Sequence, residues 1–364
     1  MGAKDFLNTH LSTYNLYKEF FSPKRLFFET LSFFKDYVLG LGRGFPTNIN
    51  LALTLRCNQN CDMCFDKATL NKGDCELSYI EIKNFIDSVK GRSPLFFITG
   101  GEPFLYKDIF KVMEYLRKNK LAFGVCTNGS ALNDAMIRRL VHLAPANVVF
   151  SIHGLMDAHD KVTGRSGNYQ RTKENIKLFC RLKKRTRVMI NLVLMPENAA
   201  KLKQFITEAE SWEVDAIRIQ HLGFLTPAEL KRHRSVWKKQ MGEASPAIHE
   251  LIISKPCFDF KETVKEIQGQ RFNIPVWFKP YLKPEEVDSW YSDRFGVRRR
   301  CLFLWKGVFV ASNGDVFPCH VIKLKLGNIK EKSLEEIYNS EKAKKFRRAI
   351  KRGLMPGCSR CCRL

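Results

Sequence analysis

Short apolar runs alternate with amphipathic stretches between residues 48 and 224, and this alternation constrains the fold more than any other feature of the sequence. The apolar runs predict strands at residues 49–55, 95–99, 123–127, 147–151, 188–194 and 216–220. The stretches between them predict helices at residues 79–89, 109–118, 133–143, 169–182 and 199–211. Strands that alternate with helices favour a parallel sheet covered by helices. Six such units predict an α/β fold, a partial (βα)6 barrel of TIM-like construction, with its chemistry at the carboxyl ends of the strands.

Three further segments flank this barrel, which occupies residues 48–224. Residues 1–47 are rich in aromatic and basic side chains and predict an N-terminal helical extension, broken into two helices at residues 22–23 by Ser-Pro. Its aromatic and basic stripe is expected either to pack on the core or to lie on a membrane surface. Residues 225–297 are charged and rich in proline, and they predict an irregular bridging segment. Residues 298–364 predict a small end domain that carries cysteines.

The composition narrows the class of protein. The twelve cysteines are clustered, which favours metal ligands in an intracellular protein over a disulfide framework. No secretory signal and no apolar run of transmembrane length is visible, so we expect a cytoplasmic protein, with peripheral membrane contact as the alternative. The net charge of +24 attracts anions non-specifically. Because no nucleic-acid-binding motif accompanies this charge, we expect no specific nucleic-acid partner.

Three cysteines share one short loop after the first predicted strand: Cys57, Cys61 and Cys64. Cubane iron–sulfur clusters normally take four thiolates. Three thiolates in a tight loop leave one iron open, and an open iron can bind a small chelating ligand. The alternative is a zinc loop, which would need a fourth ligand within the same module. The position of the loop directly after the first barrel strand favours the cluster.

Three further motifs follow the next three predicted strands. Residues 99–103 read Thr-Gly-Gly-Glu-Pro, residues 127–129 read Thr-Asn-Gly, and residues 151–154 read Ser-Ile-His-Gly. Together with the cysteine loop and Phe65 after it, these motifs resemble the radical S-adenosylmethionine (SAM) superfamily over residues 48–223. The resemblance implies that the three cysteines hold a SAM-binding [4Fe-4S] cluster, with the ring of Phe65 beside cluster and adenine.

The resemblance also implies roles for single residues around SAM. Glu102 and backbone groups around Gly100 and Gly101 are expected to hold the SAM ammonium group. Asn128 and Ser151 are expected to face the SAM ribose and carboxylate. The residues predicted to bind the cofactor are Phe65, Gly100, Gly101, Glu102, Pro103, Asn128, Ser151, Arg171 and Asn191.

Some of these positions have competing interpretations. Arg171 resembles a residue that grips the SAM carboxylate, and Arg165 is the competing candidate. Asn191 is a polar residue inside a strand, so we expect it either to line the barrel or to be a satisfied buried amide. The chain departs from the family at His153, where many members carry Asp, and no acidic role is assigned to this position.

The end domain carries a second set of cysteines. Cys301 and Cys319 flank a hairpin with an Asn-Gly turn at residues 313–314, which brings the two thiols to one end. Cys358 and Cys361 add a pair with metal-ligand spacing. Four thiolates make a closed site, either for a cluster or for structural zinc. The pattern resembles the half-size twitch version of the SPASM domain, which implies an auxiliary [4Fe-4S] cluster.

One ligand of this second site stays open, because Cys362 can replace Cys361 as the fourth thiolate. The remaining cysteines are expected to be ordinary core or surface thiols: Cys75, Cys126, Cys180 and Cys257. Among them, Cys257 is the candidate for an additional ligand.

The resemblance implies an enzyme that reductively cleaves SAM to a 5'-deoxyadenosyl radical and abstracts hydrogen from a substrate that the sequence does not name. A closed auxiliary cluster can accept the substrate electron, which would make the reaction an oxidation. By resemblance such enzymes modify ribosomal peptides or sugar-like alcohols, and the aromatic basic N-terminus also allows an anionic or lipid-like small-molecule substrate. A flavodoxin or ferredoxin would supply the electron for SAM cleavage. The competing functions are a two-cluster electron-transfer protein and an RNA-modifying enzyme.

Overall fold

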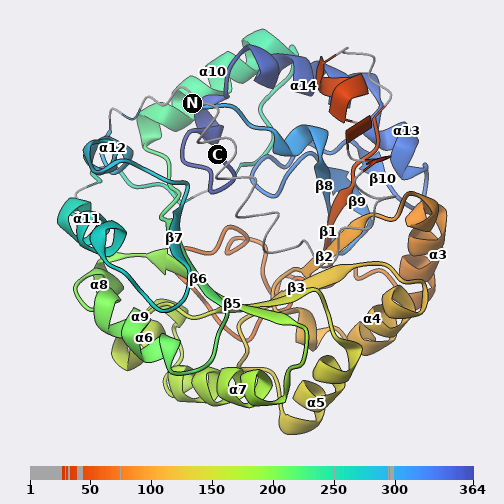
Figure 1. Cartoon of the computed structure of the whole chain (residues 1–364). Coiled ribbons are helices and arrows are strands. Elements are labelled where there is room, and N and C mark those ends of the chain that lie inside the picture. The colour runs from red at the N-terminus through yellow and green to blue at the C-terminus, as the bar shows by residue number, and fades with distance from the viewer. Residues whose placement is uncertain are drawn as a thin grey trace.

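The structure, a computed structural model, describes residues 27–28, 30–31, 33–38, 44–73, 75–248, 251–256, 258–293, 295 and 299–364. The predicted helix break at residues 22–23 and the candidate ligand Cys257 lie outside the described residues. Helices and strands are labelled as in Figure 1.

The described strands form one ten-stranded sheet in the order β10-β9-β8-β1-β2-β3-β4-β5-β6-β7. The first seven in chain order are β1 (Asn48–Ala52), β2 (Leu95–Thr99), β3 (Phe123–Thr127), β4 (Asn147–Ser151), β5 (Arg187–Leu194), β6 (Ala216–His221) and β7 (Val276–Lys279). Each of them pairs in parallel with the next. The sheet curves but does not close, because β7 and β10 are its end strands (Figure 1). This confirms the predicted α/β partial barrel.

Helices lie outside the curved sheet (Figure 1). They are α3 (Tyr79–Val89), α4 (Ile109–Lys118), α5 (Asp134–Leu143), α6 (Met156–Thr163), α7 (Asn168–Leu182), α8 (Pro196–Ala199) and α9 (Leu202–Glu210). Local sequence sets some of their starts: Ser78 caps α3 by accepting a hydrogen bond from the Glu81 N–H (3.2 Å), and the Glu81 carboxylate accepts one from the Ser78 N–H (2.7 Å). The sequence analysis did not predict α6, and its helix of residues 199–211 covers α9 but only the last residue of α8.

The two faces of the sheet carry different side chains. Successive residues of a strand point to opposite faces. Residues such as Ile98, Val125 and Ile190 belong to the large core beneath the helices. The alternate positions form a separate apolar cluster of Val149, Met189 and Ala216, against which Phe97, Cys126 and Trp277 pack. This second cluster therefore marks the inner face of the sheet.

The segment of residues 225–297 differs from the prediction of an irregular bridge. It contains α10 (Pro227–Met241), α11 (Lys261–Gly269), the seventh parallel strand β7 and α12 (Pro284–Trp290). The start of α10 is a capping box, in which the Thr226 side chain and Glu229 bond each other's backbone N–H groups. Residues 216–220 are therefore not the last parallel strand. The prediction failed because β7 is only four residues long and stands between prolines.

The described part of the N-terminal extension is helical at residues 27–28, 30–31 and 33–38. Phe33 stacks on Tyr37 at 4.9 Å between ring centroids, and Tyr37 meets Trp305 edge to face at 5.0 Å. This contact places part of the aromatic stripe on the protein's own core. Phe27 and Phe34 point outward, with 62% and 49% of their surface exposed. No described helix is long and apolar enough to cross a membrane.

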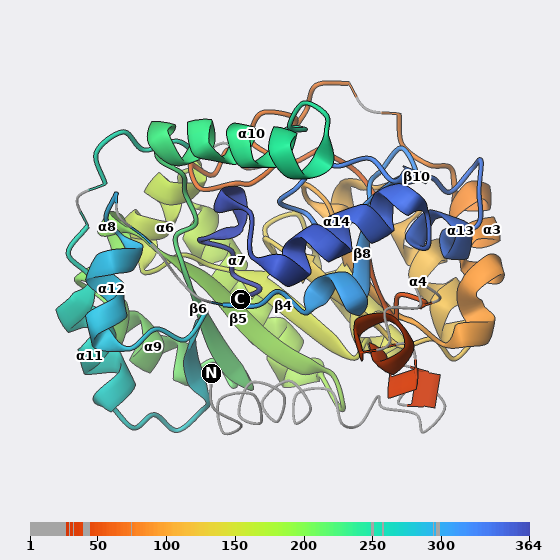
Figure 2. The ribbon, with the colours of Figure 1, turned by 90° about the horizontal axis from the view of Figure 1, so that it is seen from above.

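The end domain continues the barrel sheet. Its strands are β8 (Gly307–Val310), β9 (Asp315–Phe317) and β10 (Gly327–Asn328), and its helices are α13 (Leu334–Tyr338) and α14 (Glu341–Arg352). The hairpin of β8 and β9 confirms the predicted Asn-Gly turn. Strand β8 also pairs in parallel with β1, with Gly307 opposite Asn48. Helix α14 lies beside α10 (Figure 2), where Phe346 packs on Trp237 at 5.5 Å.

Candidate active site and auxiliary cluster site

The three cysteines of the first predicted site, Cys57, Cys61 and Cys64, follow β1 in a loop that Asn71 closes. The Asn71 side chain accepts a hydrogen bond from the Cys57 N–H (2.9 Å) and donates one to the Cys57 carbonyl oxygen (3.0 Å). Asn71 itself has φ 58°, in the left-handed region that asparagine tolerates better than most residues. The side-chain amide of Asn71 therefore fixes the start of the cysteine loop.

The other side of the cysteine loop rests on α6. The Asn60 N–H donates to the Thr163 carbonyl oxygen (3.0 Å), and the Asp62 N–H donates to the Val162 carbonyl oxygen (3.3 Å). These carbonyls belong to the last turn of α6, which has no further helix residues to bond. The helix that the sequence did not predict thus holds the loop against the barrel.

The electrostatics of the loop fit an iron–sulfur cluster. Burial, and then repulsion by the other thiols, raises the pKa of Cys61 to about 12, and burial raises that of Cys64 to about 11. Thiolate ligands at these positions therefore need a compensating cationic group, which the irons of a cluster supply. The Nε2 of Gln59 is buried and has no partner among the described residues, whereas its Oε1 accepts a hydrogen bond from Cys61. This unpaired donor fits a site lined by sulfur.

Gly100 and Gly101 let the chain after β2 pass directly against the chain that enters the cysteine loop. The Gly101 N–H donates to the Thr54 carbonyl oxygen, and the Glu102 N–H donates to the Arg56 carbonyl oxygen, both at 2.8 Å. A Cβ on either glycine would overlap backbone of that chain, and Gly100 has φ 135°. Glycine is thus required at both positions by the close approach of the protein's own cysteine loop.

Glu102 is fully buried between the motifs that follow β2 and β3. Its carboxylate accepts hydrogen bonds from the Thr127 hydroxyl (2.8 Å), the Asn128 N–H (2.7 Å) and the Phe104 N–H (3.1 Å). Burial raises the pKa of Glu102 to about 7, although these hydrogen bonds favour the charged form. Pro103 begins the short helix that supplies the Phe104 amide. The carboxylate therefore orients the loop after β3.

Asn128 belongs to a ring of three polar side chains. It donates from Nδ2 to Asn58 Oδ1 (2.8 Å), Asn58 donates to the Ser130 hydroxyl (3.0 Å), and that hydroxyl donates to Asn128 Oδ1 (2.8 Å). The ring joins the cysteine loop to the motif after β3. Sequence reasoning missed Asn58 and Ser130, although both are polar residues inside or beside the motifs it identified.

Ser151 and Asn191 are paired positions on β4 and β5, and they share the inner face of the sheet with the apolar cluster. Asn191 accepts a hydrogen bond from Arg218 Nε (2.8 Å) and donates one to Gln220 (3.0 Å). The Ser151 hydroxyl lies 3.7 Å from the thiol of Cys126. The Asn191 side chain therefore lines the barrel, and its amide oxygen and amide nitrogen both have hydrogen-bond partners. Sequence reasoning missed Arg218, which alternation along its strand could have placed on this face.

The two arginine candidates differ in their surroundings. Arg165 donates from Nη1 to the carbonyl oxygen of Asn58 in the cysteine loop (2.9 Å). The exposed side chain of Arg171 forms no hydrogen bond or ion pair with other described residues. His153 is buried, and its Nδ1 accepts a hydrogen bond from the Val193 N–H (3.3 Å). Burial lowers the pKa of His153 to about 3, so it is a neutral structural residue.

The second set of cysteines converges in the end domain. One pocket is lined by Cys301, Cys319, Cys358 and Cys361, together with apolar side chains such as Leu304 and Ile322. Cys362 is not among the lining residues. The sulfur of Cys319 accepts a hydrogen bond from the Ile322 N–H, and that of Cys361 from the Arg363 N–H, both at 3.4 Å. These features favour Cys361 over Cys362 as the fourth ligand. Within the described residues, no three His, Cys, Asp or Glu side chains are grouped as ligands of a single metal ion.

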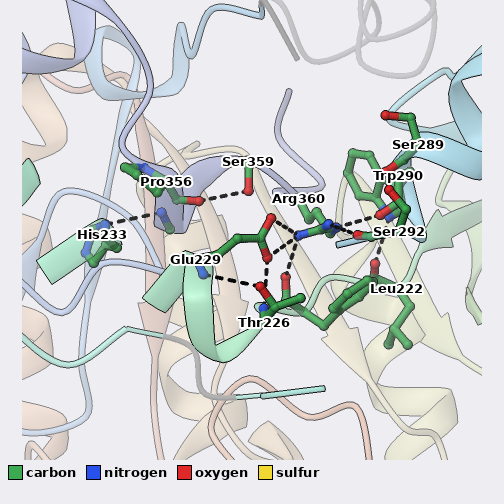
Figure 3. A network of polar contacts seen from close by, with 12 residues as sticks. Leu222, Thr226, Glu229, His233, Ser289, Trp290, Ser292, Pro356, Ser359 and Arg360 are labelled. Atoms are coloured by element: carbon green, nitrogen blue, oxygen red, sulfur yellow. Dashed lines mark hydrogen bonds and ion pairs between the residues drawn. The ribbon is translucent and has the colours of Figure 1, made fainter. Parts of the chain in front are cut away.

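Helices α10 and α12 hold the C-terminal cysteine loop in place (Figure 3). Arg360, between two of the cysteines, donates to both carboxylate oxygens of Glu229 (2.6 and 2.7 Å) and to the carbonyl oxygen of Trp290 (2.6 Å). His233, one turn after Glu229 on α10, accepts a hydrogen bond from the Gly357 N–H (3.2 Å). Two side chains at i and i+4 thus bind the same loop.

The loops that bear the two sets of cysteines also contact each other. The ring of Phe65, next to Cys64, meets the ring of His320 edge to face at 5.2 Å between centroids. Asp66 forms an ion pair with Lys323 at 2.8 Å. Phe65 and Asp66 belong to the first loop, and His320 and Lys323 follow Cys319 of the second site. The end domain therefore lies directly against the first cysteine loop.

Comparisons with known proteins agree with this arrangement. Residues 51–209 match the model of the Radical SAM superfamily, and residues 301–362 match that of SPASM, an iron-sulfur cluster-binding domain. The AdoMet-dependent heme synthase of Methanosarcina barkeri is 29% identical over 312 residues, which cover 83% of this chain and 85% of that protein. The PqqA peptide cyclase of Xanthomonas axonopodis is 23% identical over 309 residues, covering 82% and 75%. Streptococcus suis SuiB bound to S-adenosylmethionine has the same fold, with a TM-score of 0.60 at 17% identity over 93% of this chain and 77% of SuiB.

Proposed function

This chain is a radical SAM enzyme with a SPASM auxiliary domain, and from that premise we propose that it oxidises its substrate. Held by Cys57, Cys61 and Cys64, the first cluster would supply the electron that splits SAM into methionine and a 5'-deoxyadenosyl radical. Removal of one hydrogen atom from the substrate gives 5'-deoxyadenosine and a substrate radical. A cluster held by Cys301, Cys319, Cys358 and Cys361 would accept one electron from this radical, and loss of one proton to solvent would complete a two-electron oxidation.

The observation that carries this proposal is the direct contact between the two loops that bear the cysteines. The ring contact of Phe65 with His320 and the ion pair of Asp66 with Lys323 join the two loops. The pairing of β8 with β1 continues one sheet from the barrel into the end domain. A substrate held on the inner face would therefore lie within the same rigid frame as both sites.

The protein's own side chains would orient SAM in this frame. We place the SAM ammonium beside the backbone after β2, and the ribose and carboxylate beside Asn128 and Ser151. Of the two candidates for binding the SAM carboxylate, we favour Arg165 over Arg171, because Arg165 already donates a hydrogen bond to the cysteine loop. Glu102 acts on SAM through the backbone that it orients, since its carboxylate oxygens are occupied by three donors from the protein.

We further propose that the protein interacts with an electron-donor protein and with a membrane surface. A one-electron donor such as a flavodoxin or ferredoxin reduces the first site, and the net charge of +24 favours an acidic donor protein. Residues 1–44 make peripheral contact with an anionic membrane, which the outward-facing rings of Phe27 and Phe34 support. The named relatives include a heme synthase and a peptide cyclase, so similarity alone does not choose between a small-molecule and a peptide substrate.

The first experiment tests SAM cleavage. Anaerobically reconstituted protein with a strong reductant should form 5'-deoxyadenosine and methionine, and the Cys57→Ala, Cys61→Ala, Cys64→Ala triple variant should form neither. The triple variant should retain about four irons per chain, held by the auxiliary site. Zinc in place of iron in this variant would make the end domain structural and would remove the basis for an oxidation. Fully loaded wild-type protein that forms no 5'-deoxyadenosine would refute the reaction itself.

The second experiment tests the role of the auxiliary site. Replacing Cys301 and Cys319 by Ser removes two of its four thiolates. If this site takes the substrate electron, formation of oxidised product should fall much further than formation of 5'-deoxyadenosine. Product and 5'-deoxyadenosine are measured in the same reaction, so their ratio is independent of enzyme loading. An unchanged ratio would show that the auxiliary site does not accept the electron.

A further inference from the structure

The inner face of the sheet changes from apolar to polar along its strands. Its apolar cluster includes Val149, Met189, Ala216 and Trp277. Two residues further along the same four strands, where the next side chain points to the same face, stand Ser151, Asn191, Arg218 and Lys279. The polar positions lie at or near the carboxyl ends of β4 to β7, the end at which barrel enzymes bind their substrates.

Two side chains of this polar layer are cationic and have no anionic partner among the residues that the structure describes. Arg218 uses Nε to bond Asn191, and its other guanidinium N–H groups form no hydrogen bond with the described residues. Lys279 forms no hydrogen bond or ion pair with any described residue. Burial, followed by the charges of Arg218 and Arg363, lowers the pKa of Lys279 to about 8. The nearby thiols of Cys361 and Cys362 act on this pKa in the opposite direction.

Arg363 supplies a third cation from the C-terminus. Its Nη2 donates to Asn50 Oδ1 on β1 (3.0 Å), and its guanidinium lies 4.2 Å from the ring centroid of Phe303. The charge of Arg363 acts on the auxiliary thiols Cys301 and Cys319. Arg363 therefore belongs with the auxiliary site, whose thiolates are negative when they hold a cluster.

Arg218 lies on β6, the strand that pairs with β7, and its charge acts on Lys279. Its charge acts on Cys126 of β3, a residue of the inner face that Glu102 also influences. Arg218 and Lys279 are both partly buried, and cations with restricted access to water are stabilised by an anion that binds beside them. The cluster thiolates can compensate Arg363 and part of Lys279, but Arg218 faces the barrel interior without an anion from the described residues.

We propose that Arg218 and Lys279 form a binding site for an oxyanion group of the substrate, a carboxylate or a phosphate, on the inner face between the two cysteine sites. This inference rests on the proposed function, because the inner face is where the substrate would meet the 5'-deoxyadenosyl radical. Arg218 has free N–H groups for a bidentate contact, and Lys279 adds a point charge. Asn191 holds the Arg218 side chain in place. The site selects a substrate with an acidic group near the carbon that loses hydrogen.

The test measures anion binding by holoenzyme with both clusters and SAM. The probes are benzene-1,3,5-tricarboxylate and phenyl phosphate, titrated calorimetrically into wild type and into Arg218→Gln, Arg218→Lys and Lys279→Gln. The matched control is Lys203→Gln, whose exposed lysine pairs with Glu266 on the outer surface. Wild type and the control should bind at least one probe, and the two Gln variants should bind it about tenfold to a hundredfold more weakly. Arg218→Lys should bind with intermediate affinity, because lysine keeps the positive charge but cannot make the bidentate contact of a guanidinium group.

Three results would overturn the proposal. Wild type could bind neither probe, or the Gln variants could bind as tightly as wild type. The variants could also shift the reduction potential of the auxiliary cluster while probe binding stays intact, which would assign both cations to the cluster. A preference between the probes identifies the oxyanion as carboxylate or phosphate. Formation of 5'-deoxyadenosine by wild type is measured in a separate reaction, so loss of the proposed reaction is distinguishable from loss of the anion site.

Discussion

Replacing Arg360 by Met should destabilise the C-terminal loop of the auxiliary site without creating a large cavity in the core around it. The Arg360 side chain is 1% exposed and its partner Glu229 12%, so their ion pair is screened little by solvent. Arg360 also donates to the carbonyl oxygens of Trp290 and Ser292, both at 2.6 Å. Met keeps most of the apolar stem of Arg360 but lacks the guanidinium group, which lies 4.2 Å from the ring centroid of Phe224. The variant therefore loses the charge and the donors but little volume.

The magnitude follows from the burial of the pair. Removing one partner of a buried ion pair costs about 3–5 kcal/mol, because the other charge stays buried and unpaired. If this cost acts on local opening of the C-terminal loop, it raises the opening equilibrium by about two to four powers of ten. Glu229→Gln should have a smaller effect, because its side-chain oxygen still accepts a hydrogen bond from Arg360. The double variant should lose less than the sum of the single variants, since they share one interaction.

The assay is chelator-driven iron release in the Cys57→Ala, Cys61→Ala, Cys64→Ala background, in which the auxiliary site holds the remaining iron. Arg360→Met should release iron faster in proportion to loop opening, and hydrogen exchange should rise in residues 353–364. The control is Arg139→Met, which breaks an exposed ion pair with Glu114 that contributes at most about 1 kcal/mol. Iron release from Arg360→Met within twofold of the control would refute the reasoning.

Three further predictions address other parts of the chain. Gly101→Ala should lower 5'-deoxyadenosine formation about a hundredfold at equal cluster content, because its Cβ would push against the Arg56 carbonyl and displace the cysteine loop; a rate near that of wild type would contradict the packing argument. Affinity for benzene-1,3,5-tricarboxylate should fall between pH 7 and pH 9, because Lys279 loses its proton near pH 8 in the free protein, and Lys279→Gln should remove this part of the pH dependence. Deleting residues 1–44 should weaken binding to anionic vesicles at low salt, and equal binding by the truncated protein would exclude these residues as the contact.

Much of the barrel was predictable because its signals are local. The boundaries of β2, β3 and β4 match their predicted ranges, and apolar runs set off by polar loops suffice to find them. The cysteine loop and its partner motifs were found for the same reason, since each follows one strand. The prediction failed for β7, whose four residues give alternation too little length to register. It also missed α6, which has no side-chain cap at its start.

The contacts that assemble the site were less predictable because they join distant residues. Asn71 closes the cysteine loop from fourteen positions away, and Arg360 meets Glu229 across 131 positions. Neither pairing leaves a periodic pattern in the sequence. The pair of cations Arg218 and Lys279 was partly predictable, because alternation places Arg218 on the inner face once its strand is known. Only the parallel pairing of β6 with β7 shows that Lys279 lies on the adjacent strand.

The parallel pairing of β8 with β1 makes the SPASM domain inseparable from the barrel that precedes it. Asn48 to Leu51 pair on one side with β2 and on the other with Gly307 to Val310. Cutting the chain before the end domain would turn β1, a central strand, into an edge with a row of unpaired N–H and C=O groups. That edge adjoins the loop of the first cluster. The cut would therefore make the edge prone to aggregation and would expose the first cluster to oxidants. The end domain is thus not an interchangeable module, and transplanting it between relatives requires that β1 and β8 be exchanged together.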